Sequence, residues 1–157
     1  GRLQFERSTM RDRIADALRG RGEDVSPSDL VLSMHIPDFL GPLTPEACGE
    51  SIEMAKQFFA AHFPEDRYRY AVCHSWLLDP QLADYLPENS NIIQFQRRFE
   101  LAEGANDADT SILHFVFGPA PENLDELPQR STLERAVVTH LRNGNHWQVR
   151  SGWFPLR

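Results

Sequence analysis

The chain has 157 residues and a mass of 18.0 kDa, enough for one domain with a hydrophobic core. A hydrophobic content of 41% excludes wholesale disorder, and no apolar run is long enough for a membrane-spanning helix. Two cysteines exclude a disulfide-rich secreted scaffold, and a net charge of −7 without a lysine-rich tract argues against nucleic-acid binding. We therefore expect a soluble, cytoplasmic domain that binds neither nucleic acid nor a membrane.

Residues 1–26 are predicted to be a segment that continues from an upstream region. The chain begins without an initiator methionine, and Leu3, Met10, Ile14 and Leu18 recur at roughly helical spacing. This pattern favours a basic amphipathic helix over residues 3–19, or a linker that becomes helical on docking. We expect the chain to be the C-terminal part of a longer protein, with its main domain at residues 27–157.

Three later segments have the start and stop signals of helices. Thr44 followed by Pro45 predicts a helix that ends before Pro64. Asp79 and Pro80 begin a short helix through Leu86. A capping box at Ser131 and Glu134 begins a third helix, which runs to about Asn143.

Five segments are predicted strands because they are apolar, rich in aromatic or β-branched residues, or alternating: residues 30–37, 68–76, 91–101, 111–117 and 146–154. The alternation is clearest in 91–101, where Ile93, Phe95 and Phe99 share one side. The order of elements predicts a mixed α/β fold, one sheet with helices packed against it.

The densest cluster of reactive side chains is Cys73-His74-Ser75-Trp76. Neighbours on a strand point to opposite faces, so His74 and Trp76 share one side and Cys73 faces the other. Cys73 and His74 therefore cannot form a nucleophile–base pair, and Cys73 is interpreted as a buried structural cysteine.

Three histidines lie in predicted strands: His35, His74 and His114. Converging imidazoles would suit a catalytic zinc ion, but the sequence lacks the short ligand spacings typical of metal sites. Packed or hydrogen-bonded histidines are the main alternative, and a general base is the third. No metal is predicted.

A row of hydrogen-bonding side chains, Gln94, Gln96 and Arg98, lies on the polar side of the predicted strand 91–101. Such a row can orient a substrate, or it can be an ordinary solvated sheet face. Arg97 falls on the apolar side, where a cation must reach water, pair with a carboxylate or mark a ligand site. The stripe Trp147, Val149 and Trp153 is core, or an interface with an absent portion of the protein.

Three stretches together carry a family resemblance: LVLSMHIP with GPLTPEAC, then CHSWLLDPQLADYLPENSNIIQFQRRF, then the HW…GWF ending. They resemble the GNAT-like C-terminal domain of bacterial acyltransferase-domain proteins, in which a helical N-terminal module precedes this domain. The resemblance covers roughly residues 28–157. It implies a mixed, largely antiparallel sheet, acyl transfer from acyl-CoA such as acetyl-CoA, and the N-terminal domain of the same polypeptide as a partner.

The sequence departs from this family in one place. GNAT enzymes hold the CoA pyrophosphate at a glycine-rich turn between a strand and the following helix. The segment AEGANDADTS after the predicted strand 91–101 is acidic and has one glycine, Gly104. An acidic loop would repel a pyrophosphate.

We therefore predict acyl transfer to an amine or hydroxyl of a small molecule. In this interpretation His74 is the general base, and the substrate is bound by Trp76, Gln94, Gln96, Arg97 and Arg98. The alternatives are a non-catalytic module that binds a ligand or completes the fold of its neighbour, and a zinc hydrolase built on the three histidines.

Overall fold

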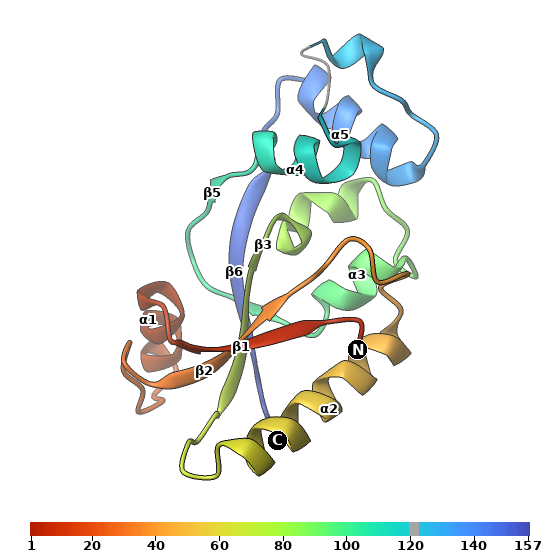
Figure 1. Cartoon of the computed structure of the whole chain (residues 1–157). Helices are drawn as coiled ribbons and strands as arrows, with labels where there is room; N and C mark the ends of the chain where they lie inside the picture. Colours follow the sequence, from red (N-terminus) through yellow and green to blue (C-terminus); the bar gives the residue numbers. More distant parts are fainter. Residues whose placement is uncertain (120–122) are drawn as a thin grey trace.

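The computed structural model describes residues 1–119 and 123–157 and shows one twisted sheet with helices on both sides (Figure 1). This confirms the predicted mixed α/β fold. The strands are β1 (Gln4–Thr9), β2 (Leu30–His35), β3 (Tyr70–Ser75), β4 (Glu100–Leu101), β5 (Asn106–Asp107) and β6 (Gln148–Pro155). The helices are α1 (Asp12–Gly20), α2 (Pro45–His62), α3 (Asn91–Gln96), α4 (Asp109–Phe117) and α5 (Thr132–Arg142), with 3₁₀ turns at η1 (Trp76–Leu78), η2 (Pro80–Asp84) and η3 (Leu124–Glu126).

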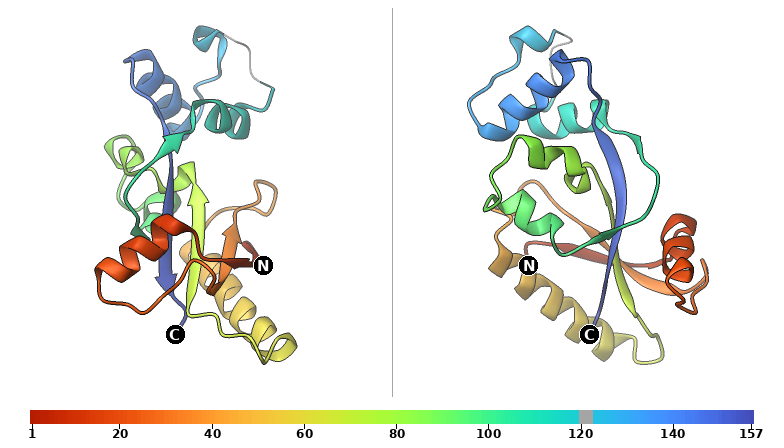
Figure 2. Two further views of the ribbon diagram at one scale, coloured as in Figure 1. Left: turned by 90° about the vertical axis from the view of Figure 1, so that its left-hand side faces the viewer. Right: turned by 180° about the vertical axis from the view of Figure 1, so that it is seen from behind.

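The strands follow the order β1-β2-β3-β6-β4, and β5 also pairs with β6. Among the described residues, β2 and β3 form the one parallel pair, and every other pair is antiparallel. Helices α1 and α2 lie on opposite sides of the sheet, and α4 and α5 lie together at one end of the molecule (Figure 2). The sheet is therefore largely antiparallel, as predicted.

Alternation along the strands divides the core between the two sides of the sheet. Val72 and Trp153 pack with Ile14 and other apolar residues of α1. Cys73, one residue further along β3, belongs to a larger cluster with residues of α2, α3, α4 and α5. Of the two alternatives for the stripe Trp147, Val149 and Trp153, the structure shows the core for its tryptophans, because Trp147 and Trp153 are 0% and 2% exposed.

The helices predicted from the capping residues Thr44 and Ser131 are confirmed, whereas the helix predicted from Asp79 through Leu86 is the shorter 3₁₀ turn η2. Thr44 Oγ1 accepts a hydrogen bond from the Ala47 N–H at 3.2 Å, and Pro45 is the first residue of α2. Ser131 Oγ accepts from the Glu134 N–H at 3.0 Å and begins α5. Each of these ends is fixed by residues adjacent in sequence.

Two predicted strands are wrong. Residues 91–96 form α3, because Ser90 Oγ caps Ile93 N–H and Phe95 packs on Phe99 one turn later, at 5.0 Å between ring centroids. Residues 109–117 form α4. In both segments the apolar residues also fit helical spacing, and over so short a stretch the two periods are not distinguishable.

The predicted N-terminal helix is correct only in its second half. Residues 12–20 form α1, but residues 4–9 form β1, which pairs with β2 from Gln4–His35 to Thr9–Leu30. Leu3, directly before β1, is buried and packs in the core. The proposed division at residues 26 and 27 stays a prediction.

Gly152 on β6 lies where a side chain would collide with its neighbours. A Cβ atom there would be 3.0 Å from Leu78 Cδ1 and 3.1 Å from the Glu100 carbonyl oxygen. We expect Gly152→Ala to lower the free energy of unfolding by about 1–3 kcal/mol, as overpacking does. Urea-induced unfolding measures this, with Gly49→Ala on α2 as the control, since no atom lies within 4 Å of its added Cβ. Equal stability of the two variants would contradict the expectation.

Candidate active site

The parallel strands β2 and β3 separate at their carboxyl ends. They pair only at Leu32–Ala71 and Ser33–Val72. Beyond these pairs β2 continues on β1 as far as His35, and β3 continues on β6 as far as Ser75. Each strand is therefore held by its outer neighbour while the two diverge (Figure 1). Beyond their last paired residues, the N–H and C=O groups on the facing edges of β2 and β3 are not bonded to the other strand and point into the gap between them.

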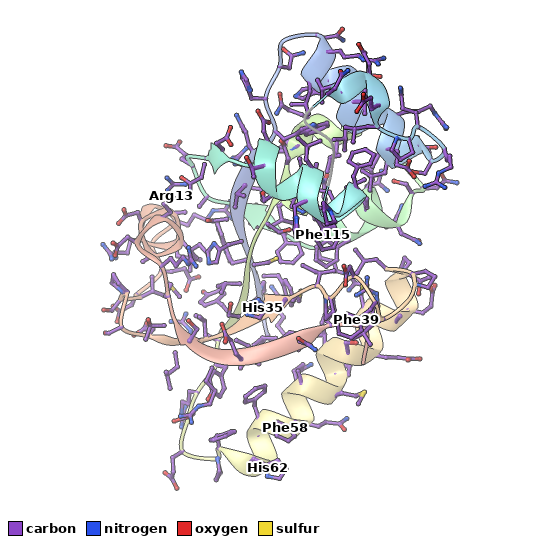
Figure 3. The ribbon with its side chains drawn as sticks, turned by 45° about the horizontal axis from the view of Figure 1, so that its top comes forward. Arg13, His35, Phe39, Phe58, His62 and Phe115 are labelled. Carbon is purple, nitrogen blue, oxygen red and sulfur yellow. The ribbon has the colours of Figure 1, made fainter. Side chains whose placement is uncertain are left out.

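An apolar cavity of about 250 Å³ lies where the strands separate. Its apolar lining consists of Met34, Ile36, Trp76, Leu77, Phe115 and Val149. Phe115 stands edge-on to Trp76, with 5.3 Å between ring centroids. Figure 3 shows Phe115 below α4, across from His35 and Phe39. Phe39, in the segment after β2, is 75% exposed and adds to the apolar surface on this side of the molecule.

A smaller, polar cavity of about 120 Å³ adjoins the apolar one. Met34, His35 and His74 line both, so they form the boundary between them. The remaining lining of the polar cavity comes from the three strands and the start of α1: Glu6, Ser8, Thr9, Arg11, Ser33 and Val72. A ligand that occupied both would pass the two imidazoles.

His35 forms a hydrogen-bonded pair with Glu6. Its Nε2 lies 2.9 Å from Glu6 Oε1, and the side chains are 54% and 61% exposed. The antiparallel register of β1 and β2 brings these residues together from 29 positions apart. An ionised carboxylate only accepts hydrogen bonds, so in the neutral ring Nε2 carries the hydrogen and Nδ1 keeps its lone pair. His35 is thereby oriented as a proton acceptor.

The His74 side chain is less exposed than that of His35. Its Nδ1 lies 2.7 Å from the Oγ of the buried Ser151. Burial, followed by the charges of Arg11, His35 and Arg13, lowers the pKa of His74 to about 4. This imidazole is therefore neutral at pH 7. The predicted neighbour Trp76 begins η1 and is 6% exposed, with its ring in the wall of the apolar cavity.

Gln94 and Gln96 do not form the predicted row, because they belong to a helix. Gln94 Nε2 donates to the Glu88 carbonyl at 2.9 Å. Gln96 Nε2 donates to the carbonyls of Leu77 and Asp79 at 2.8 and 2.9 Å. Neither glutamine lines the two cavities. Their contact with a substrate stays a prediction, and the strand on which it was based is absent.

Arg97 and Arg98 likewise lie outside the two cavities. Arg97 is half exposed and lies 3.7 Å from a carboxylate oxygen of Glu88. Arg98 donates to the Pro45 carbonyl at 2.7 Å and so joins the end of α3 to the start of α2. A substrate role for either arginine also stays a prediction.

The acidic segment 102–109 does not follow either of the diverging strands. The segment between the diverging strand β2 and its following helix α2 is 36–44, in which Asp38 is the one acidic residue. Asp109 accepts a hydrogen bond from Trp147 N–H at 2.7 Å and its other oxygen lies 2.7 Å from His146 Nδ1. Whether the acidic segment 102–109 keeps CoA from binding stays a prediction.

The three predicted histidines do not converge. His114 is exposed on α4 and lines neither cavity. In the described part of the chain, the group of potential metal ligands that lie close together is Asp107, Asp109 and His146, and both oxygens of Asp109 are already engaged. Burial raises the pKa of the Cys73 thiol to about 12, so the thiol stays protonated. These contacts do not support the zinc hydrolase or a cysteine nucleophile.

Comparison with known proteins identifies the family to which the chain belongs. The sequence model of the family described as "GNAT-like C-terminal domain" matches residues 1–154. No curated protein matches the chain. Across the residues that the structure describes, no helix combines the length and apolar character needed to cross a bilayer.

Crystal structures of acyltransferases match the whole chain with a TM-score of 0.85. One, in complex with decanoyl-CoA, is 45% identical, and this chain covers 45% of it. A second holds decanoyl-CoA and teicoplanin, at 45% identity and 46% coverage. A mutant with octanoyl-CoA is 44% identical, again with 46% covered. The chain thus spans less than half of the proteins it matches, and it belongs to the family of GNAT-like C-terminal domains.

Proposed function

We propose that the protein containing this domain transfers an acyl group from acyl-CoA to an amine or hydroxyl of a small molecule. The observation that carries the proposal is the divergence of β2 and β3, which joins an apolar cavity to a polar cavity at two histidines. Acyltransferases that are 44–45% identical over the whole chain bind decanoyl-CoA or octanoyl-CoA. The apolar cavity is suited to an acyl chain, and the polar cavity to the acceptor.

His35 is the general base in this proposal. Its Nδ1 takes a proton from the acceptor as the acceptor's nitrogen or oxygen attacks the thioester carbonyl. The carbonyl π electrons move to oxygen, where N–H groups facing the gap can stabilise the charge. The C–S bond then breaks, its electron pair goes to sulfur, and the released thiolate takes up a proton. Glu6 keeps the His35 ring oriented.

His74, the base predicted from sequence, is the alternative. It lines the same boundary, but a pKa of about 4 makes its imidazole a weak proton acceptor at pH 7. We propose that His74 shapes the floor of the site, and the variants described in the Discussion distinguish the two histidines.

The direct test uses the full-length protein with decanoyl-CoA. We expect binding by calorimetry and release of the free CoA thiol when a suitable amine or hydroxyl acceptor is added. Binding without thiol release from any acceptor would favour the non-catalytic alternative. No binding would contradict the proposal itself.

Phe115 should contribute to the affinity for long acyl chains. It is 39% exposed and forms one wall of the apolar cavity. We expect Phe115→Ala to weaken decanoyl-CoA binding about tenfold, since losing part of an aromatic contact costs on the order of 1.4 kcal/mol. Calorimetry with decanoyl-CoA and butyryl-CoA measures this, and the short chain should be affected less.

Phe58→Ala is the matched control for this variant. Phe58 is 52% exposed on α2, and in Figure 3 it lies at the end of α2 away from Phe115. Its removal should leave the affinity for both donors unchanged. If the two variants bind decanoyl-CoA equally well, the acyl chain does not occupy this cavity.

We further propose that the protein is bacterial and cytoplasmic, and that the N-terminal domain of the same polypeptide is a partner of this one. Cys48 and Cys73 are buried free thiols, which is typical of a reducing compartment. The matched acyltransferases are more than twice as long as this chain, which supports a further domain.

A further inference from the structure

The polar cavity contains a cation that no acidic side chain neutralises. Arg11 is exposed, lies between β1 and α1 and lines the cavity. Within residues 1–119 and 123–157 its guanidinium forms no hydrogen bond or ion pair. The one carboxylate in the lining, Glu6, is bonded to His35. The cavity therefore offers a free guanidinium next to an engaged carboxylate.

Three hydroxyls that form no side-chain hydrogen bond to a described residue line the same cavity. Ser33 is 8% exposed, lines the cavity and forms no side-chain hydrogen bond to any described residue. Ser8 and Thr9, on β1, are further hydroxyls of the lining without a protein partner in the described ranges. The Ser33 oxygen is not sealed from solvent, so Ser33 offers an accessible hydroxyl to a polar ligand in this cavity.

The electrostatic potential at the boundary of the cavity is positive, which favours binding of an anion. Arg11 and Arg13 both act on His74 in the direction expected for positive charge, by disfavouring its protonated form. Arg13 is partly engaged, since it donates to Asn106 Oδ1 at 3.1 Å. The positive potential of Arg11 thus reaches the imidazole at the boundary of the two cavities.

We propose that Arg11 and Ser33 bind a carboxylate of the acyl acceptor and so place its nucleophilic nitrogen or oxygen beside His35. The identification of the ligand as the acyl acceptor rests on the proposed acyl transfer. The existence of the anion site does not depend on it. A guanidinium binds a carboxylate through two parallel N–H donors, and a serine hydroxyl can donate a third hydrogen bond. The small cavity admits a carboxylate on a short stem, and its position separates this group from the acyl chain.

The first experiment measures binding without turnover, in the full-length protein. N-acetylglycine carries a carboxylate but no nucleophilic amine, and N-acetylglycinamide is its neutral match. We expect N-acetylglycine to raise the pKa of His74, followed by imidazole NMR, in the native protein but not in Arg11→Gln. The amide should have no effect in either. Arg67→Gln, at an exposed arginine outside both cavities, should respond as the native protein does.

Three results would overturn the anion site: no response of His74 to N-acetylglycine, an equal response to the amide, or a response that persists in Arg11→Gln. Because no acyl-CoA is present, these outcomes are independent of catalysis. An Arg11-dependent response in a protein that never releases CoA thiol would leave the site standing and remove only the proposed function.

The second experiment tests the link to acyl transfer. Short ω-amino acids are compared as acceptors with their amides of the same length. We expect kcat/KM to favour the acids by about 10–100-fold, the range of hydrogen bonds to charged groups, through a lower KM. Arg11→Gln should remove this preference and Arg67→Gln should keep it. An unchanged preference in Arg11→Gln would show that the acceptor does not use this site.

Discussion

His35→Ala in the full-length protein should lower kcat for acyl transfer by about 10²–10⁴-fold, the usual contribution of a general base. The affinity for acyl-CoA should change little, because the donor's chain is expected in the apolar cavity and the proton is taken from the acceptor. Among the described residues that line both cavities, His35 is the one with an orienting carboxylate, Glu6 Oε1 at 2.9 Å. Steady-state release of the CoA thiol measures the effect.

Two further variants separate orientation from chemistry. Glu6→Gln keeps a hydrogen-bonding side chain next to His35 but removes the charge, so we expect a smaller loss in kcat, of about 10–100-fold. His74→Ala should reduce turnover far less than His35→Ala. The reverse order of the two histidine variants would establish the assignment made from the sequence and exclude His35 as the base.

Asp79→Ala should lower the free energy of unfolding by about 3 kcal/mol, the largest effect on stability that we expect. Asp79 is fully buried and accepts three hydrogen bonds. They come from Gln81 N–H at 3.0 Å, Gln81 Nε2 at 3.1 Å and Gln148 N–H at 2.8 Å. Alanine would leave two backbone N–H groups without this partner. Urea-induced unfolding measures the loss.

Asp84→Ala provides the matched control, because Asp84 is an exposed aspartate at the end of η2. Its replacement should change stability by no more than about 0.5 kcal/mol. Asp79→Asn, which keeps one acceptor oxygen, should lie between the two. If Asp79→Ala and Asp84→Ala unfold at the same urea concentration, the buried carboxylate does not join β6 to the turn after β3.

The elements predicted correctly are those whose signals are local and unambiguous. Helix α2 has a capping threonine and a proline at its first position, and α5 has its capping serine. The strands β2, β3 and β6 lie within the predicted segments or one residue beyond. The sequence predicts strands where α3 and α4 lie, because a few apolar residues fit both the strand and the helix period over so short a segment.

The site was predicted in part for the same reason. Cys73 to Trp76 is a dense cluster in the sequence, so the sequence indicates His74 and Trp76, which line the apolar cavity, and it indicates His35 as one of three histidines in predicted strands. Glu6 is not indicated, because nothing near it in sequence points to a partner. The glutamines and arginines of 94–98 were assigned from a strand that is not formed.

The amino-acid sequence is enough to predict the family, the α/β class, the capped helices and which residues of β3 face each side of the sheet. These properties depend on motifs and on neighbours within a few positions. The place where β2 and β3 separate, the lining of the two cavities and the contact between Glu6 and His35 depend on the folded sheet. Pairing between strands joins residues tens of positions apart, and its register is set by the packing of the whole sheet rather than by any local segment.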